Sequence, residues 1–322
     1  MRLWAHRTQL AGLLALAAVA ACRREGGVAR GDGALTVIDD AGRRVELHAP
    51  ARRIVSLSPA VTELLFALGA GDRVVGRTTW CDFPPAARAV PSVGDGLNPN
   101  IEAVAARRPD LVVLYRSPLN GTAARQLERL GIAAVVVRQD RLEDVGRAAR
   151  LLGRLAGVEA SGDSLAASIE RLLANPPPAS HVSLAFVVWD NPPMVIGGGS
   201  YLDELATLAG ARNVFHDVGS ASATVAIETI AARDPDAIVV LSDTAPAAPA
   251  AFAGRREWQA VRAVRERRFV QLTGSLYGRP NPRAAEAVAE LRRLLAAPGA
   301  RRAGGPGGPG GSGGAGGAGR TR

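Results

Sequence analysis

Short apolar runs alternate with stretches of helical periodicity along most of the chain. Buried strands are predicted at residues 53–57, 111–114, 133–137, 183–188, 237–241 and 269–272. Helices are predicted at residues 59–68, 101–106, 126–130, 201–208, 227–232 and 282–296. Residues 35–38 and 44–47 flank a turn and predict a β-hairpin. This alternation predicts an α/β fold of mostly parallel sheets with helices on both faces.

One unit occurs twice in the chain. Residues 101–113 and 227–239 are identical at eight of 13 aligned positions, at an offset of 126 residues. Residues 63–70 and 204–211 form a weaker pair in the same order. An offset this long is unlike the short period of a solenoid. We therefore expect two lobes of one design, at residues 34–141 and 179–298.

The segment between the two lobes lacks strand signals. Apolar residues recur at helical intervals from Leu142 to Leu155, Gly157 interrupts them, and the spacing resumes at residues 165–173. Three prolines follow at residues 176–178 and stop the pattern. Residues 142–175 are therefore predicted to be a stiff helical connector.

Neither end of the chain has the pattern of a folded domain. Basic residues precede an apolar stretch at residues 10–18, which is too short to span a bilayer and is typical of a secretion signal. Residues 19–22 read Val-Ala-Ala-Cys and resemble a bacterial lipobox. Residues 1–22 are thus expected to be a lipoprotein signal peptide with Cys22 as the lipidated residue; ordinary cleavage near Ala21 is the alternative. Residues 23–33 are expected to be a flexible tether, and the glycine-rich residues 299–322 to be disordered.

The charge of the chain is concentrated outside its predicted lobes. Of the formal net charge of +9, residues 1–21 carry +2 and residues 299–322 carry +4, which leaves +3 for residues 22–298. A body so close to neutral has no stripe that could follow a phosphate backbone, so we expect no nucleic-acid partner. Cys81 is the only cysteine besides Cys22, so no disulfide is expected within the mature chain.

Several motifs resemble one family of proteins. They are Arg-Arg-Ile-Val-Ser-Leu-Ser-Pro at residues 52–59, Thr62-Glu63, Trp-Cys-Asp-Phe-Pro-Pro at residues 80–85, and Asn100-Ile101-Glu102. These motifs resemble the periplasmic binding proteins of ABC importers for iron chelates and cobalamin, from about residue 35 to residue 297. The resemblance implies two Rossmann-like lobes joined by a single long rigid helix, with the ligand cleft between the lobes. It also implies a monomer that captures a metal chelate and delivers it to a permease dimer with its ATPase.

Two glutamates carry the expected contact with the permease. Glu102 and Glu228 occupy the paired positions where family members carry glutamates that dock onto permease arginines, and both lie in the stronger repeat. A two-lobed protein would present one carboxylate from each lobe to a two-fold partner. The alternative is that each is a solvated first-turn residue favoured by the helix dipole.

The walls of the cleft are expected from loops at the carboxyl ends of the strands. The candidate ligand-binding residues there are Trp80, Tyr115, Arg116, Trp189, Asn191, Tyr277, Arg279 and Asn281. Aromatic faces together with arginine and amide donors suit a large, flat ligand with polar edges. Trp80, Tyr115 and Tyr277 match aromatic positions of cobalamin-binding members, which favours a corrinoid. Gly96, Ser222 and Leu276 stand where those members often carry tryptophan, so a ferric siderophore or haem stays open.

Two other classes of function have weaker support. A site for a bare metal ion would need clustered ligands, but His48, His181 and His216 are far apart and lack ligand spacing. An enzyme could use Gly-Gly-Gly-Ser at residues 197–200 to hold a phosphate, but the stretch matches no nucleotide-binding motif and is better explained as a turn before a helix. We therefore predict a membrane-anchored lipoprotein receptor in the periplasm or at the cell surface, with no enzymatic activity, no resident cofactor and no metal site.

Overall fold

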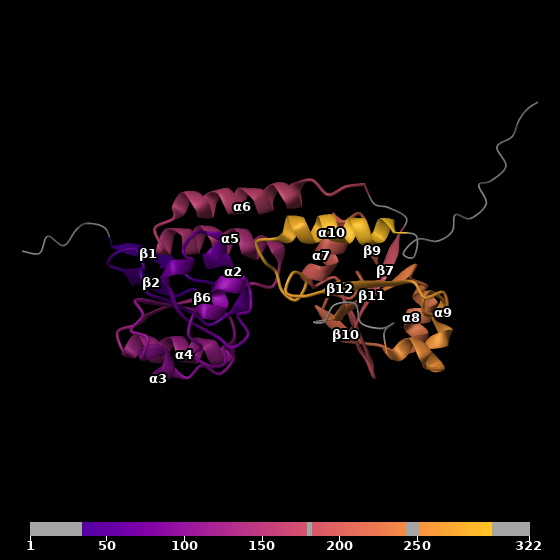
Figure 1. Ribbon diagram of the computed structural model, residues 1–322, viewed down its shortest axis with the longest axis horizontal. Helices are drawn as coiled ribbons and strands as arrows, with labels where there is room; N and C mark the ends of the chain where they lie inside the picture. The colour runs from indigo at the N-terminus through magenta and orange to yellow at the C-terminus, as the bar shows by residue number, and fades with distance from the viewer. Residues whose placement is uncertain (1–33, 179–181, 243–250, 298–322) are drawn as a thin grey trace, which may run out of the picture.

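A computed structural model describes residues 34–178, 182–242 and 251–297, which form two α/β lobes joined by a pair of helices (Figure 1). The expected signal peptide with Cys22, the tether at 23–33, His181 and the glycine-rich tail at 299–322 lie outside the described residues. Within the described part of the chain, no helix is long and apolar enough to cross a membrane.

The N-terminal lobe is built on a four-stranded parallel sheet. Its strands are β3 (Ile54–Ser56), β4 (Val74–Arg77), β5 (Leu111–Tyr115) and β6 (Ala133–Val137), in the order β4-β3-β5-β6. The hairpin of β1 (Leu35–Ile38) and β2 (Arg44–Leu47) lies beside β6, where the Asp40 amide donates to the Val136 carbonyl. Helices α2 (Pro59–Ala67), α3 (Ile101–Ala105) and α4 (Pro118–Arg129), with short 3₁₀ turns at Gly71–Arg73 and Pro85–Ala89, complete the lobe.

The starts of these helices follow from local sequence. The side chains of Asn100 and Ser117 accept hydrogen bonds from backbone amides in the first turns of α3 and α4. Pro59 and Pro118 occupy first-turn positions, where a missing amide hydrogen costs nothing. Gly69 follows the end of α2 and has φ +79°, a left-handed conformation that favours glycine.

The C-terminal lobe contains a mixed sheet. Strands β7 (Ser183–Asp190), β11 (Ala237–Ser242) and β12 (Phe269–Thr273) are parallel, and β8 (Pro193–Ile196) and β10 (Ser222–Thr224) extend them antiparallel in the order β10-β8-β7-β11-β12. The short β9 (Arg212–Asn213) pairs with β7. Helices α7 (Tyr201–Leu208), α8 (Ile227–Arg233), α9 (Arg262–Arg265) and α10 (Ala284–Ala296), with 3₁₀ turns at Ala251–Gly254 and Glu257–Ala260, cover the sheet. The sequence pattern predicted the three parallel strands, but it missed β4, β8, β9 and β10.

The sequence repeat corresponds to a repeat in structure. Its first copy forms α3 and β5, and its second copy forms α8 and β11, so each copy is a short helix followed by an inner strand of a parallel set. The weaker pair, residues 63–70 and 204–211, covers most of α2 and most of α7 with the turns that follow them. The chain therefore has two lobes of related design, as its sequence predicts.

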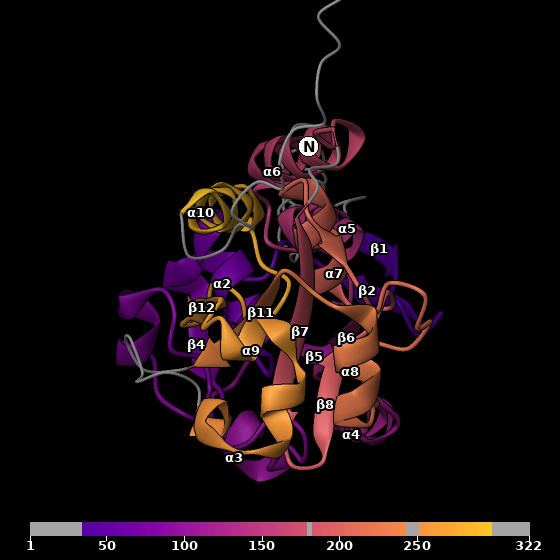
Figure 2. The ribbon, with the colours of Figure 1, turned by 90° about the vertical axis from the view of Figure 1, so that its right-hand side faces the viewer.

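The connector between the lobes differs from the expected single long helix. It is a pair of helices, α5 (Leu142–Leu155) and α6 (Glu159–Ala174), that pack against each other (Figures 1 and 2). The break falls at Gly157, which has φ +63° and cannot continue a right-handed helix. The interruption at Gly157 was visible in the sequence, but the return of α6 along α5 was not.

Both connector helices contribute to the cores of both lobes. Leu142 of α5 and Ile169 of α6 belong to the apolar cluster above the C-terminal sheet. Leu152 of α5 and Ala166 of α6 belong to the corresponding cluster of the N-terminal lobe. Each sheet has a second apolar cluster on its opposite face. Because the connector is part of both cores, rotation of one lobe against the other would expose apolar side chains.

Two glycines set the distance between α5 and α6. A Cβ added at Gly162 would lie 2.6 Å from the Ala149 carbonyl oxygen, and one at Gly153 would lie 3.0 Å from the Gly162 Cα. We expect Gly162→Ala to push the helices apart and to lower the free energy of unfolding by about 2 kcal/mol, measured by urea unfolding.

The matched control is Gly121→Ala in α4, where the nearest atom to an added Cβ is Arg125 Nη1 at 3.9 Å. There, alanine should leave stability unchanged or raise it by roughly 0.5 kcal/mol, because alanine has the better helix propensity. Equal stabilities of the two variants would contradict the close packing of α5 on α6.

Candidate functional site

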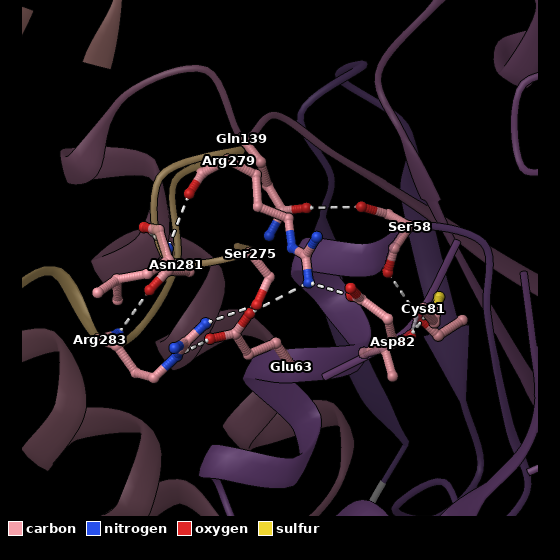
Figure 3. A network of polar contacts seen from close by, with 12 residues as sticks. Ser58, Glu63, Cys81, Asp82, Gln139, Ser275, Arg279, Asn281 and Arg283 are labelled. Carbon is pink, nitrogen blue, oxygen red and sulfur yellow. Dashed lines mark hydrogen bonds and ion pairs between the residues drawn. The ribbon is translucent and has the colours of Figure 1, made fainter. Parts of the chain in front are cut away.

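The carboxyl ends of the parallel strands in the two lobes face each other. The loop of residues 274–283 follows β12 in the C-terminal lobe and reaches the N-terminal lobe, where Arg279 and Arg283 bind acidic side chains. Figure 3 shows these arginines entering from the C-terminal side to meet Glu63 and Asp82. The edge where an open α/β sheet binds its ligands is thus shared by both lobes.

The N-terminal lobe has an open hollow of about 200 Å³ at this edge. Its lining residues are Leu57, Ser58, Pro59, Thr78, Trp80, Asp95, Gly96, Leu97 and Tyr115. Trp80 is 69% exposed and Leu97 is 64% exposed, so a large apolar surface is open to solvent here. A larger hollow of about 740 Å³ lies between β2 and the start of β6, away from the strand ends, and contains none of the predicted site residues.

Tyr115 is fixed at the wall of this hollow. Its phenol donates a 2.6 Å hydrogen bond to Asp140 Oδ1. Burial, with this hydrogen bond and the charge of Asp140, raises the pKa of Tyr115 to about 12, so the phenol stays protonated at neutral pH. Arg116, the next residue, is exposed and lies outside the lining of the hollow.

The C-terminal lobe presents a second exposed aromatic residue at its strand end. Trp189 is 61% exposed, and its indole nitrogen donates to the backbone carbonyl of Asn191 at 2.9 Å. Asp190 forms a 2.8 Å ion pair with Arg255. The Asn191 side chain is exposed. Trp189 and Asn191 therefore lie on an accessible turn held by local bonds, and their contact with a ligand stays a prediction.

Two side chains that were predicted to contact the ligand, Tyr277 and Asn281, are buried instead. Tyr277 is 1% exposed within the apolar cluster of the C-terminal lobe, and its phenol donates to the Ala287 carbonyl at 3.1 Å. Asn281 is also buried, and its amide nitrogen donates to the carbonyls of Leu276 and Arg279. Both side chains hold the 274–283 loop together, so we correct their assignment from ligand contact to loop support.

Four charged residues join the lobes across the cleft. Arg279 Nη2 lies 3.0 Å from Asp82 Oδ1 and 3.5 Å from Glu63 Oε2, and Arg283 Nε donates to Glu63 Oε1 at 2.6 Å (Figure 3). The Arg283 guanidinium also stacks over the Phe83 ring at 3.7 Å. The carboxylate of Glu63 is 2% exposed, so this is a largely desolvated ion pair between lobes. Glu63 and Asp82 belong to motifs of the sequence, but no local pattern predicted that they lie in the site.

A second carboxylate makes the equivalent connection from the other lobe. Glu204 of α7 accepts hydrogen bonds from Arg141 Nε at 2.8 Å and from the Leu142 amide at 2.9 Å, at the start of the connector. Burial raises the pKa of Glu204, and Arg141 with the Leu142 amide opposes that rise. Glu63 and Glu204 are the first residues of the weaker sequence repeat. That repeat was the one signal in the sequence that could have identified both.

The predicted docking residues lie on helices away from the connector. Glu102 and Glu228 are exposed and lie in the first turns of α3 and α8. Both helices lie on the side of their lobes remote from α6 (Figures 1 and 2). Among the described residues neither carboxylate takes part in a hydrogen bond or ion pair, and both residues are exposed, so both carboxylates are accessible.

The structure also bears on the two alternatives of a bare-metal site and a phosphate-binding glycine stretch. Across residues 34–178, 182–242 and 251–297, no group of three or more His, Cys, Asp and Glu side chains could hold a metal ion. The glycines at residues 197–199 pack against the backbone of residues 216–221, where an added Cβ would lie 2.1–2.6 Å from carbonyl oxygens. Ser200 then caps α7. The stretch is therefore a turn before a helix, as predicted.

A sequence model of the periplasmic binding protein family matches residues 54–276. The chain belongs to this family. It is therefore a binding protein rather than an enzyme, as its sequence predicts, and it carries a ligand rather than a resident cofactor.

Several individual relatives are substrate-binding proteins, and two of those named here bind vitamin B12 or heme. The chain is 29% identical over 268 residues to YvrC of Bacillus subtilis, an uncharacterized ABC transporter substrate-binding lipoprotein, covering 80% of this chain and 84% of YvrC. It is 33% identical over 198 residues to the vitamin B12-binding protein of Salmonella paratyphi A, covering 59% of this chain and 72% of that protein. A periplasmic heme binding protein from Pseudomonas aeruginosa superposes with a TM-score of 0.62 at 25% identity, covering 75% and 91% of the two chains. The binding protein therefore groups with the substrate-binding proteins of ABC importers.

The interlobe ion pairs give a stability prediction. Glu63→Gln should lower the free energy of unfolding by about 2 kcal/mol, because the substitution leaves Arg283 partly buried without its carboxylate. Urea unfolding monitored by circular dichroism would measure the loss.

Glu170→Gln is the matched control, since Glu170 forms an ion pair with Arg150 at 2.5 Å but is exposed. Its removal should leave stability nearly unchanged, because solvent screens exposed pairs. A Glu63→Gln protein as stable as the control would contradict a structural role for the interlobe pair.

Proposed function

We propose that this binding protein captures a corrinoid outside the cytoplasmic membrane and delivers it to the permease dimer of an ABC importer. The observation that supports this best is the open, apolar hollow around Trp80 and Leu97 at the edge shared by the two lobes. A corrinoid is a broad, rigid macrocycle with amide side chains. Such a ligand would lay its flat face against exposed aromatic rings and would leave its amides to polar groups at the rim.

The polar side chains that line the hollow are mostly neutral. Ser58 and Thr78 contribute hydroxyl groups that are largely buried in this structure and hydrogen-bonded within the protein, and a ligand would reach them at the floor of the hollow. Ser58 Oγ donates to Gln139 Oε1 at 3.1 Å, and Gln139 lies beside Arg279 in Figure 3. Hydroxyl and amide groups match the amide rim of a corrinoid. We therefore place the ligand between this hollow and the 274–283 loop, with Arg279 at its edge and Trp189 and Asn191 on the opposite lobe.

Haem or a ferric siderophore is the second candidate, and the family likeness to heme binding proteins supports it. Haem would need an axial ligand from the protein. The phenol of Tyr115 is held by Asp140 and has its pKa raised to about 12, so using it for iron would require breaking that bond and removing a strongly held proton. The phenols of Tyr201 and Tyr277 are buried. These observations favour the corrinoid.

A lipid anchor at Cys22 would keep the receptor at the membrane, and the exposed Glu102 and Glu228 would contact the permease. Each lobe carries one of these carboxylates in an equivalent helix. This arrangement suits a partner built from two equivalent halves, because each half would meet the same helix start. We infer that the receptor acts as a monomer.

Ligand binding can be tested by titrating the protein with cyanocobalamin and following the heat released. We expect saturable binding, and Trp80→Ala should weaken it about tenfold because the side chain is the largest exposed apolar surface of the hollow. Ile38→Ala is the control, since Ile38 is also exposed (63%) but lies on the β1–β2 hairpin. Saturation by haemin or a ferric chelate in place of cobalamin would assign the protein to iron acquisition.

The docking role is tested by reversing two charges. Glu102→Arg with Glu228→Arg should leave ligand affinity unchanged and abolish ligand uptake in cells that depend on this importer. The matched control is Glu159→Arg with Glu170→Arg, two exposed residues of α6 on the remote side of the molecule. Loss of ligand binding in the first variant, or equal loss of uptake in both, would refute docking through Glu102 and Glu228.

A further inference from the structure

We propose that Asp82 determines ligand charge: by occupying Arg279 from the facing lobe, it makes the cleft select an uncharged ligand over an anionic one. This inference rests on the proposed function, since it concerns the same cleft, but it would hold for an uncharged iron chelate as well as for a corrinoid. An arginine at a strand end is a typical anion-binding group, so Arg279 taken without its partners would favour an anionic ligand.

Each arginine at the cleft is matched by a carboxylate of the facing lobe. Arg279 and Arg283 come from the C-terminal lobe, and Asp82 and Glu63 come from the N-terminal lobe, so the four charges sum to zero. Arg279 Nη2 is the atom that both carboxylates share, at 3.0 Å from Asp82 and 3.5 Å from Glu63. An anionic ligand would have to displace a carboxylate that already binds Arg279. The binding free energy that the ligand gains from Arg279 is therefore largely offset by the loss of that ion pair.

The other charged side chains of the cleft do not give it a net positive charge. The residues lining the hollow include one acid, Asp95, and no base. The Asp95 carboxylate accepts a hydrogen bond from the Leu97 amide at 3.0 Å, which fixes it beside the hollow. On the opposite lobe, Arg255 is paired with Asp190 at 2.8 Å. At the hollow itself, the acids Asp95 and Asp140, the latter bound to the Tyr115 phenol, outnumber the exposed base Arg116 beside Tyr115, so the local balance of charge opposes an anion.

The two carboxylates have different burial, which assigns the selective role to Asp82. Glu63 is 2% exposed and holds Arg283 as well, so it belongs to the packing between lobes. Asp82 is 50% exposed and lies two residues after Trp80, and among the described residues its carboxylate pairs with Arg279 alone. Asp82→Asn would thus leave Arg279 with only the longer, 3.5 Å contact to Glu63, which also holds Arg283, so Arg279 would become the less neutralised of the two arginines.

The experiment titrates the purified full chain with three probes: cyanocobalamin and a ferric hydroxamate without net charge, and haemin with two ionised propionates. The wild type should prefer an uncharged probe. Asp82→Asn should bind haemin about tenfold tighter than the wild type does, with less than a twofold change for the uncharged probes. The gain should vanish in Asp82→Asn/Arg279→Gln and should shrink at high salt, because screening weakens an accessible charge.

Glu159→Gln is the matched control, since it makes the same change in net charge at an exposed position of α6 away from the cleft. It should leave all three affinities unchanged. An Asp82→Asn protein that gains no affinity for haemin, a gain of equal size in Glu159→Gln, or a wild type that prefers haemin would overturn the inference. Preference of the wild type for the ferric hydroxamate over cyanocobalamin would refute the corrinoid assignment alone, because both probes are uncharged.

Discussion

A carboxylate buried between the two lobes sets the geometry on which the site depends. Glu63 is almost inaccessible and binds Arg279 and Arg283 from a loop more than two hundred residues later in the chain. Removing any one partner would leave a desolvated charge, so the lobes, the loop and α2 keep one arrangement together. Glu204 acts in the same way at the other side of the cleft, where it fixes the start of the connector.

The connector strengthens this constraint by packing rather than by charge. Helices α5 and α6 pack into the apolar clusters of both lobes, so the connector is not a hinge on the surface. Opening the lobes widely would separate apolar side chains and break the Glu63 ion pairs in one step. The two effects together suit a receptor whose cleft is formed before the ligand arrives, and whose affinity does not depend on a large closure.

The same arrangement explains why the cleft is apolar although arginines enter it. Parallel strands bring their carboxyl ends to one edge, and the facing lobes place arginines of one edge against carboxylates of the other. The charged side chains pair with each other and hold the lobes together. Trp80, Leu97 and Trp189 are the large apolar side chains that stay exposed. Arginines that could bind an anion in a single lobe are therefore already paired, and aromatic side chains provide most of the surface that a ligand can contact.

The sequence by itself determined the α/β class, the two related lobes, most of the parallel strands and the exposure of Trp80, Trp189, Glu102 and Glu228. Those features follow from local apolar periodicity, from capping and from a repeat, which all act over short stretches of chain. Tertiary structure decided what depends on distant partners. Tyr277 and Asn281 turned inward to support a loop, the connector folded back at Gly157, and Arg279 found carboxylates in the other lobe. Burial and ion pairing of this kind depend on segments that only the folded chain brings together, so no local pattern could reveal them.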